Sequence, residues 1–118
     1  MTTGGALSCV IPLWNEAESL EPLHRALAHV LESMGREYEI VFVDDGSTDG
    51  SPEILGRLYE SDPHVRVLSF RGHYGKSAAL MAGFRRSRFP FVLTLDADLQ
   101  DEPGEIPKLV EVIEQGAD

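Results

Sequence analysis

Apolar residues follow two alternating patterns along the chain. Short, nearly continuous apolar runs predict four buried β-strands, at residues 6–12, 38–45, 65–70 and 91–96. Apolar residues at helical spacing predict four helices, at residues 15–35, 51–60, 76–87 and 106–116. Strands that alternate with helices of roughly ten residues or more are typical of a parallel sheet. The pattern therefore predicts an α/β domain with helices on both faces of a parallel sheet.

Local signals predict where the first two helices begin and end. Asn15, with Glu18 three residues later, has the spacing of a capping box, and Gly35 supplies a stop. Ser51 and Pro52 are suited to the N-cap and the first position of the second helix.

Composition narrows the class of protein. A length of 118 residues suits one domain, residues 1–118, with its own core. Twenty acidic against ten basic residues give a net charge of −10, which argues against nucleic-acid binding because few cations are present to neutralise phosphates. The single cysteine, Cys9, lies in an apolar run and is expected to be buried. Without a signal peptide or an apolar stretch of about 20 residues, we expect a soluble, cytoplasmic protein.

Polar residues with candidate chemistry follow the predicted strands. In a parallel sheet, ligands bind beyond the carboxyl ends of the strands. Asp44 and Asp45 follow the second strand, and Asp96 and Asp98 follow the fourth. Carboxylates that gather at one edge repel each other unless a cation or hydrogen-bond donors hold them. Hard oxygen ligands suit Mg²⁺ or Mn²⁺, which share their coordination with phosphate oxygens.

Simpler interpretations remain open for several of these residues. Residues 44–47 suit a turn in which aspartate side chains accept hydrogen bonds from backbone amides. Residues 72–77, GHYGKS, end like a phosphate-binding P-loop, but that motif requires glycine where Phe70 stands. Lys76 and the amides at the start of its helix remain candidates to face an anion. His73 lies in the same loop, where a solvated side chain is the expectation.

Four segments of the chain resemble the amino-terminal half of family 2 glycosyltransferases of the GT-A fold. They are VIPLWNEAESL (10–20), IVFVDDGSTDGSPEIL (40–55), GKSAALMAGF (75–84) and VLTLDADLQDEPGEIPKLV (92–110). The resemblance covers about residues 7–115, and within the family it is to polyprenyl-phosphate sugar transferases of the dolichyl-phosphate mannosyltransferase type. It implies a Rossmann-like parallel sheet that forms the nucleotide-binding half of a GT-A fold.

The resemblance also implies roles for residues at the strand ends. Those implied to contact a nucleoside diphosphate sugar are Pro12, Trp14, Glu16, Val43, Asp45 and Ala97. Those implied to hold a divalent metal, Mg²⁺ or Mn²⁺, are Asp96, Asp98 and Gln100. Such a metal bridges the diphosphate and neutralises charge that grows on the leaving nucleoside diphosphate.

Two features depart from the family pattern. The subgroup tends to have Arg-Asn-x-Gly-Lys where this chain has residues 72–76, and Arg71 stands one position early. The catalytic base, the segments that bind the lipid-phosphate acceptor and the membrane-associated helices are implied to lie beyond Asp118. We therefore expect the donor-binding part of an inverting transferase, placed at the cytoplasmic face of the membrane in a longer form. Its exposed sheet edge is expected to favour homo-oligomers.

Other functions of α/β domains fit the sequence less well or stay open as alternatives. A Mg²⁺-binding receiver domain has a similar size, but its acidic residues end strands one and three, whereas here they end strands two and four. A nicotinamide-binding domain requires Gly-x-Gly-x-x-Gly after the first strand, and that motif is missing there. A nucleotide-binding fragment without turnover stays open as an alternative.

Overall fold

The computed structural model describes residues 5–97, which form four parallel strands and three helices. The strands are β1 (Leu7–Leu13), β2 (Tyr38–Asp44), β3 (Val65–Ser69) and β4 (Phe91–Thr94). The helices are α1 (Ala17–Ser33), α2 (Ser51–Ser61) and α3 (Lys76–Arg86). The strand order is β3-β2-β1-β4, with every neighbouring pair parallel. The helix predicted at residues 106–116 lies outside the described residues.

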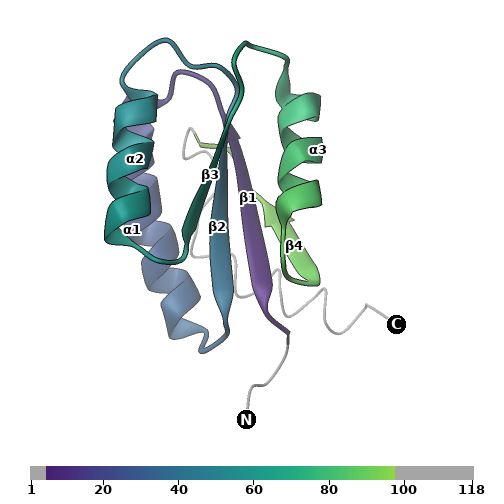
Figure 1. Cartoon of the computed structure of the whole chain (residues 1–118). Helices are drawn as coiled ribbons and strands as arrows, with labels where there is room; N and C mark the ends of the chain where they lie inside the picture. Colours follow the sequence, from purple (N-terminus) through teal and green to yellow (C-terminus); the bar gives the residue numbers. More distant parts are fainter. Residues whose placement is uncertain (1–4, 98–118) are drawn as a thin grey trace.

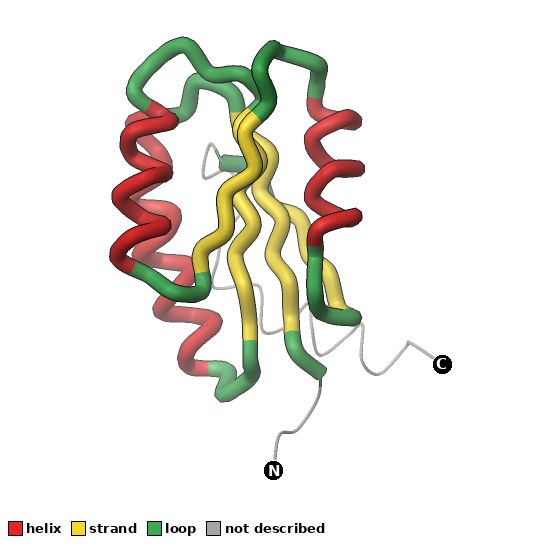
Figure 2. Tube along the Cα trace, viewed as in Figure 1, coloured by secondary structure: helices red, strands yellow, loops and turns green. Residues whose placement is uncertain are grey.

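Helices cover both faces of the sheet, as predicted (Figure 1). Helices α1 and α2 lie side by side on one face, and α3 lies on the other (Figure 2). Leucines of α1 and α2 pack on alternate residues of β1 and β2 such as Ile11 and Phe42. On the opposite face, Val10, Val41 and Val43 pack against Ala79 of α3. Because both faces are covered, β1 and β2 are buried along their whole lengths.

The edges of the described sheet are β3 and β4. The predicted pairing of such an edge with a second copy stays a prediction. No helix within residues 5–97 has the length and apolar character needed to cross a bilayer.

The start of α1 differs from the prediction. The capping residue is Glu16 rather than Asn15, and Glu16 makes no side-chain capping bond. Asn15 has a positive φ of 53°. Its side-chain oxygen accepts hydrogen bonds from the amides of Thr48 (2.7 Å) and Asp49 (3.2 Å). The capping-box prediction was therefore wrong, because the carboxamide of Asn15 is engaged by the loop after β2.

The loop after β1 and the loop after β2 are joined by hydrogen bonds in both directions. The amide of Asn15 donates to Ser47 Oγ (2.8 Å), and the amide of Glu16 donates to Ser51 Oγ (3.1 Å). Ser51 is the first residue of α2, with Gly50 at the N-cap and Pro52 in the first turn, so the predicted N-cap was one residue late. These bonds fix the backbone that follows Trp14, up to Glu16.

Candidate functional site

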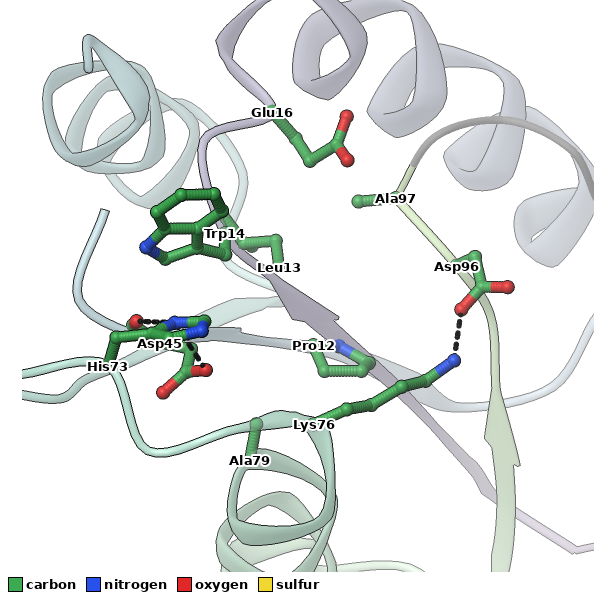
Figure 3. Close-up of a pocket in the computed structure, with 10 residues that line it drawn as sticks. All are labelled: Pro12, Leu13, Trp14, Glu16, Asp45, His73, Lys76, Ala79, Asp96 and Ala97. Carbon is green, nitrogen blue, oxygen red and sulfur yellow. Dashed lines mark hydrogen bonds and ion pairs between the residues drawn. The ribbon is translucent and has the colours of Figure 1, made fainter. Parts of the chain in front are cut away.

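A cavity of about 310 Å³ opens beyond the carboxyl ends of β1, β2 and β4 (Figure 3). The topology places it there because parallel strands deliver their following loops to one edge. Its lining residues are Pro12, Leu13, Trp14, Glu16, Asp45, His73, Lys76, Ala79, Asp96 and Ala97.

The cavity gathers most of the predicted site residues. Seven of them line it: Pro12, Trp14, Glu16, Asp45, Lys76, Asp96 and Ala97. Val43 is fully buried beneath α3 and is not among the lining residues. Asp98 and Gln100 lie outside the described residues. The structure therefore brings together the predicted residues from four separate segments, while their roles in binding stay predictions.

Asp45 holds the loop between β3 and α3. Its Oδ1 accepts a hydrogen bond from the amide of Tyr74 (2.7 Å), and its Oδ2 accepts one from the amide of Gly75 (2.9 Å). Its carboxylate also lies 3.0 Å from Nδ1 of His73. These partners were not predictable from the sequence, because nothing in the residue pattern shows which loop returns to a given aspartate.

Asp44 has a local role. Its Oδ1 accepts a hydrogen bond from the amide of Ser47 at 2.9 Å. The turn interpretation of residues 44–47 is therefore confirmed for Asp44. The two adjacent aspartates therefore have different structural roles. Asp44 stabilises its own turn, and Asp45 binds the loop between β3 and α3.

His73 lies between Asp45 and Trp14. Besides the carboxylate, its Nδ1 lies 3.2 Å from the backbone oxygen of Asp45. Its ring centroid lies 4.8 Å from that of Trp14, with 49° between the ring planes. The His73 side chain is 55% exposed, so the expectation of a solvated histidine is confirmed, although the ring also contacts Asp45 and Trp14. The sequence signal that marks this position is its departure from the family's Arg-Asn-x-Gly-Lys pattern.

Lys76 and Asp96 form an ion pair across the cavity. Lys76 Nζ lies 2.8 Å from Asp96 Oδ1, and both side chains are partly exposed, at 63% and 43%. Lys76 is the first residue of α3, so its ammonium group adds to the positive end of that helix. Figure 3 shows the Glu16 side chain on the far side of the cavity from Lys76. The cavity thus carries a cation and carboxylates within one small volume.

A metal site is only partly represented in the described residues. Within residues 5–97, no group of three or more His, Cys, Asp or Glu side chains is placed to share a metal ion. Asp96 offers one carboxylate at the cavity. Mg²⁺ commonly takes one or two carboxylates and completes its shell with phosphate oxygens and water. Asp96 therefore fits a metal that is shared with a phosphate ligand, rather than a closed protein cage.

The arrangement offers a small ligand both apolar and charged contacts. Trp14 and Pro12 provide apolar surface, while Lys76 provides a positive charge. A concave site with a few polar groups among apolar ones is the usual form of a small-molecule site.

Sequence comparison relates the chain to known transferases. The family model described as Glycosyl transferase family 2 matches residues 8–118. Undecaprenyl-phosphate 4-deoxy-4-formamido-L-arabinose transferase of Edwardsiella ictaluri is 48% identical over 114 residues, which are 95% of this chain and 35% of that protein. The protein of the same name from Salmonella paratyphi B is 43% identical over 113 residues, with the same shares covered. The chain spans about a third of the length of these curated relatives.

Structural comparison gives the same fold. Mannosyltransferase PcManGT from Pyrobaculum calidifontis, in complex with GDP-Man and Mn²⁺, matches with a TM-score of 0.74 and 26% identity, over 99% of this chain and 34% of that chain. S. aureus TarS 1–349 in complex with UDP-GlcNAc matches with a TM-score of 0.75 and 21% identity, over 95% and 32%. The predicted fold class, a parallel α/β sheet of the GT-A type, is confirmed.

Proposed function

The chain belongs to glycosyl transferase family 2, and from this we propose that its cavity binds the nucleoside diphosphate part of a sugar donor. The observation that carries the proposal is the convergence of Trp14, Asp45, Lys76 and Asp96 on one cavity beyond the strand ends. These residues come from four segments that the parallel sheet brings to one edge.

The nucleoside is placed on the side of the cavity that β1 and β2 form. Trp14 and Pro12 give the base an apolar wall, and Asp45 accepts a hydrogen bond from the base or ribose. Glu16 and Ala97 border the ribose from the opposite side of the cavity. Val43 acts through its position in the strand that leads to Asp45, since its side chain is buried.

The diphosphate is placed against Lys76 and the start of α3. The amides of a helix's first turn lack partners within the helix and favour an anion. The Lys76 ammonium group lies at the same place and leaves Asp96 for a phosphate oxygen when the donor binds. The ion pair between Lys76 and Asp96 is partly exposed, so replacing Asp96 by a phosphate as the partner of Lys76 costs little free energy.

A divalent cation, Mg²⁺ or Mn²⁺, is placed beside Asp96, with Asp98 and Gln100 as its other predicted ligands. The oxygen chemistry of this set fits such an ion. When bound, the ion neutralises charge that develops on the departing diphosphate. The Mn²⁺ and GDP-Man in the complex of the similar PcManGT support this placement.

The proposed reaction moves the sugar to a polyprenyl phosphate. An acceptor phosphate oxygen forms a bond to the anomeric carbon while the bond to the nucleoside diphosphate breaks, so the configuration inverts. The electron pair of the broken bond stays on the diphosphate. The undecaprenyl-phosphate acceptors in the names of the relatives support this class of acceptor. The catalytic base and the acceptor-binding segments belong, in this proposal, to a longer protein that acts at the cytoplasmic face of a membrane.

Calorimetric titration with UDP and GDP, with and without Mn²⁺, tests the proposal. We expect one nucleotide to bind more tightly with Mn²⁺, and the Mn²⁺ effect to disappear in Asp98→Ala and Asp96→Ala. Glu53→Ala, an exposed change on α2, serves as the control. Absence of binding of both nucleotides contradicts the proposal, and phosphorylation by acetyl phosphate instead points to a receiver domain. If this chain binds the nucleotide but a longer protein that contains it transfers no sugar, the alternative of a nucleotide-binding fragment without turnover is supported.

A further inference from the structure

Trp14 is the single tryptophan of the chain, and it is 46% exposed at the rim of the cavity. A large aromatic side chain beside a cavity is a usual mark of a ligand site rather than of core packing. Its indole serves as a stacking surface for a planar ligand at a lower ordering cost when neighbouring groups hold its orientation.

His73 supplies that support. Its imidazole lies against the indole, with ring centroids 4.8 Å apart. Figure 3 shows the imidazole between the indole and the Asp45 carboxylate. Nδ1 of His73 lies 3.0 Å from Asp45 Oδ2, so the ring is held on the side away from Trp14.

Asp45 is a rigid anchor for this ring. The residue is only 3% exposed, and its carboxylate also accepts the amides of Tyr74 and Gly75. A carboxylate has about four lone-pair sites. The amides of Tyr74 and Gly75 use two of them, so acceptor sites remain for a ligand.

We propose that His73 is a positioning residue for the nucleobase. Its ring is held by Asp45 and lies against the indole of Trp14, so it fixes the orientation of the surface on which the base stacks. The proposal rests on the proposed function of the cavity as a nucleoside diphosphate site. Bases stack on aromatic side chains in many nucleotide-binding sites, since every base has a π-face. His73 prepares that surface before the ligand arrives, which reduces the ordering cost of binding.

The same loop offers a matched control. Tyr74 is 68% exposed and packs edge-on against Phe70, with ring centroids 5.8 Å apart. Its side chain does not line the cavity, and its bond to Asp45 uses the backbone amide. Tyr74→Ala therefore removes an aromatic ring from this loop without touching the contact between His73 and Trp14.

The test compares ligands with and without a base. Binding of UDP, GDP and inorganic pyrophosphate, each with Mn²⁺, is measured by calorimetry for the wild type, His73→Ala, His73→Phe and Tyr74→Ala. We expect His73→Ala to lower the affinity for the preferred nucleotide about tenfold, or about 1.4 kcal/mol, with pyrophosphate affinity unchanged. His73→Phe keeps a ring against the indole and should lose less affinity. Tyr74→Ala should bind as the wild type does.

Trp14 emission gives an independent readout, because the chain has no second tryptophan. Removing the imidazole uncovers one face of the indole, so emission in His73→Ala should move to longer wavelength, whereas Tyr74→Ala should not change it. Equal nucleotide affinity in His73→Ala and the wild type overturns the role of His73 while leaving the nucleotide site intact. An equal loss for nucleotide and pyrophosphate also overturns it, since that indicates general damage to the loop. If the wild type binds neither nucleotide, the proposed function itself fails.

Discussion

The hydroxyl of Ser8 donates a 2.6 Å hydrogen bond to the carboxylate of Glu39, its register partner across β1 and β2. Glu39 is fully buried at the end of the sheet opposite the cavity. It also accepts hydrogen bonds from the amide and side chain of Arg88 (2.8 and 3.2 Å) and from the side chain of Arg66 (3.1 Å). One buried carboxylate thus joins β1, β3 and the loop that leads from α3 to β4.

Replacing Glu39 by alanine should lower the free energy of unfolding by about 2–3 kcal/mol, because Ser8 and the Arg88 amide lose a charged acceptor in a buried place. Urea denaturation measures the change. Glu37→Ala removes an exposed carboxylate two residues away and should stay within about 0.5 kcal/mol of the wild type. Equal effects for the two variants would show that the Glu39 contacts add no stability.

Acid should destabilise the fold through Glu39 and Asp62. Burial alone would raise the pKa of Glu39, but hydrogen bonds from Ser8, Arg88 and Arg66 outweigh it and leave the pKa below its ordinary value. Burial likewise opposes the hydrogen bonds from His64 and His24, which leave the pKa of Asp62 lowered. A carboxyl group with a lowered pKa in the folded state contributes stability that is present above about pH 4 and is lost as the pH falls through the folded-state pKa.

The urea midpoint, measured between about pH 7 and about pH 3, should therefore fall towards acid. Asp62→Asn removes one of the carboxyl groups whose pKa is lowered in the folded state, and it should flatten this slope. A slope identical to that of the wild type would exclude Asp62 as a source of the acid sensitivity.

The features that follow from topology were predictable from the sequence. Alternating strands and helices predict parallel pairing, and parallel pairing brings the residues after β2 and β4 to one edge, where Asp45 and Asp96 both line the cavity. The apolar run around Cys9 predicted its burial, which is confirmed and which raises the pKa of its thiol to about 12.

The choice of side-chain partners was not predictable in the same way. Glu39 lies inside a strand that was predicted to be nearly continuously apolar, and its partners Arg66 and Arg88 are 27 and 49 residues away along the chain. Asn15 fits a capping pattern, yet its carboxamide contacts a loop 33 residues further on. Such pairings depend on where separate loops meet in space, which local patterns do not encode.

Two glycine-to-alanine changes in helices should have opposite effects. A Cβ on Gly83 of α3 would clash with Val10 Cγ1 and would lie 3.2 Å from Val43 Cγ2, so the helix would have to move away from the sheet. We expect Gly83→Ala to cost about 1–3 kcal/mol of unfolding free energy. Among the described residues, none outside its own stretch of helix has an atom within 4 Å of such a Cβ on Gly56 of α2. Gly56→Ala should therefore stabilise the fold by about 0.5–1 kcal/mol. If Gly83→Ala and Gly56→Ala shift the thermal midpoint in the same direction, the close packing of α3 on the sheet is contradicted.

Lys76 should matter for binding and not for stability. Its pair with Asp96 is partly exposed, and such pairs contribute about 0–1 kcal/mol. Lys76→Ala should leave the thermal midpoint almost unchanged, yet weaken binding of nucleoside diphosphate about tenfold or more, because a charged hydrogen bond to phosphate contributes about 1.5–3 kcal/mol. Calorimetry and thermal denaturation separate the two effects.

Arg57 provides the control for Lys76. It is an exposed cation paired with Glu21 at 3.6 Å, outside the cavity. Arg57→Ala should change neither binding nor stability appreciably. If Lys76→Ala and Arg57→Ala bind nucleotide equally well, Lys76 does not contact the diphosphate.

Gly46 allows the loops after β2 and β3 to approach each other, and its substitution should damage both stability and binding. Its φ is 78°, and a Cβ there would lie 2.5 Å from the carbonyl carbon of Gly72 and 2.9 Å from the amide nitrogen of His73. These are backbone atoms, so in Gly46→Ala the loop that carries His73 must move away from Asp45. Gly35 also has a positive φ, 69°, but no atom of residues 5–97 outside its own neighbourhood lies within 4 Å of such a Cβ.

Both alanine variants share the cost of a left-handed backbone, roughly 1–2 kcal/mol. Only Gly46→Ala adds the clash with the loop after β3. We therefore expect a larger loss of unfolding free energy in Gly46→Ala than in Gly35→Ala, and a weaker affinity for nucleoside diphosphate in Gly46→Ala alone. Calorimetry with the preferred nucleotide and Mn²⁺ checks the second point. If Gly46→Ala loses stability but binds nucleotide like Gly35→Ala, the contact between Asp45 and the loop supports the fold without shaping the cavity.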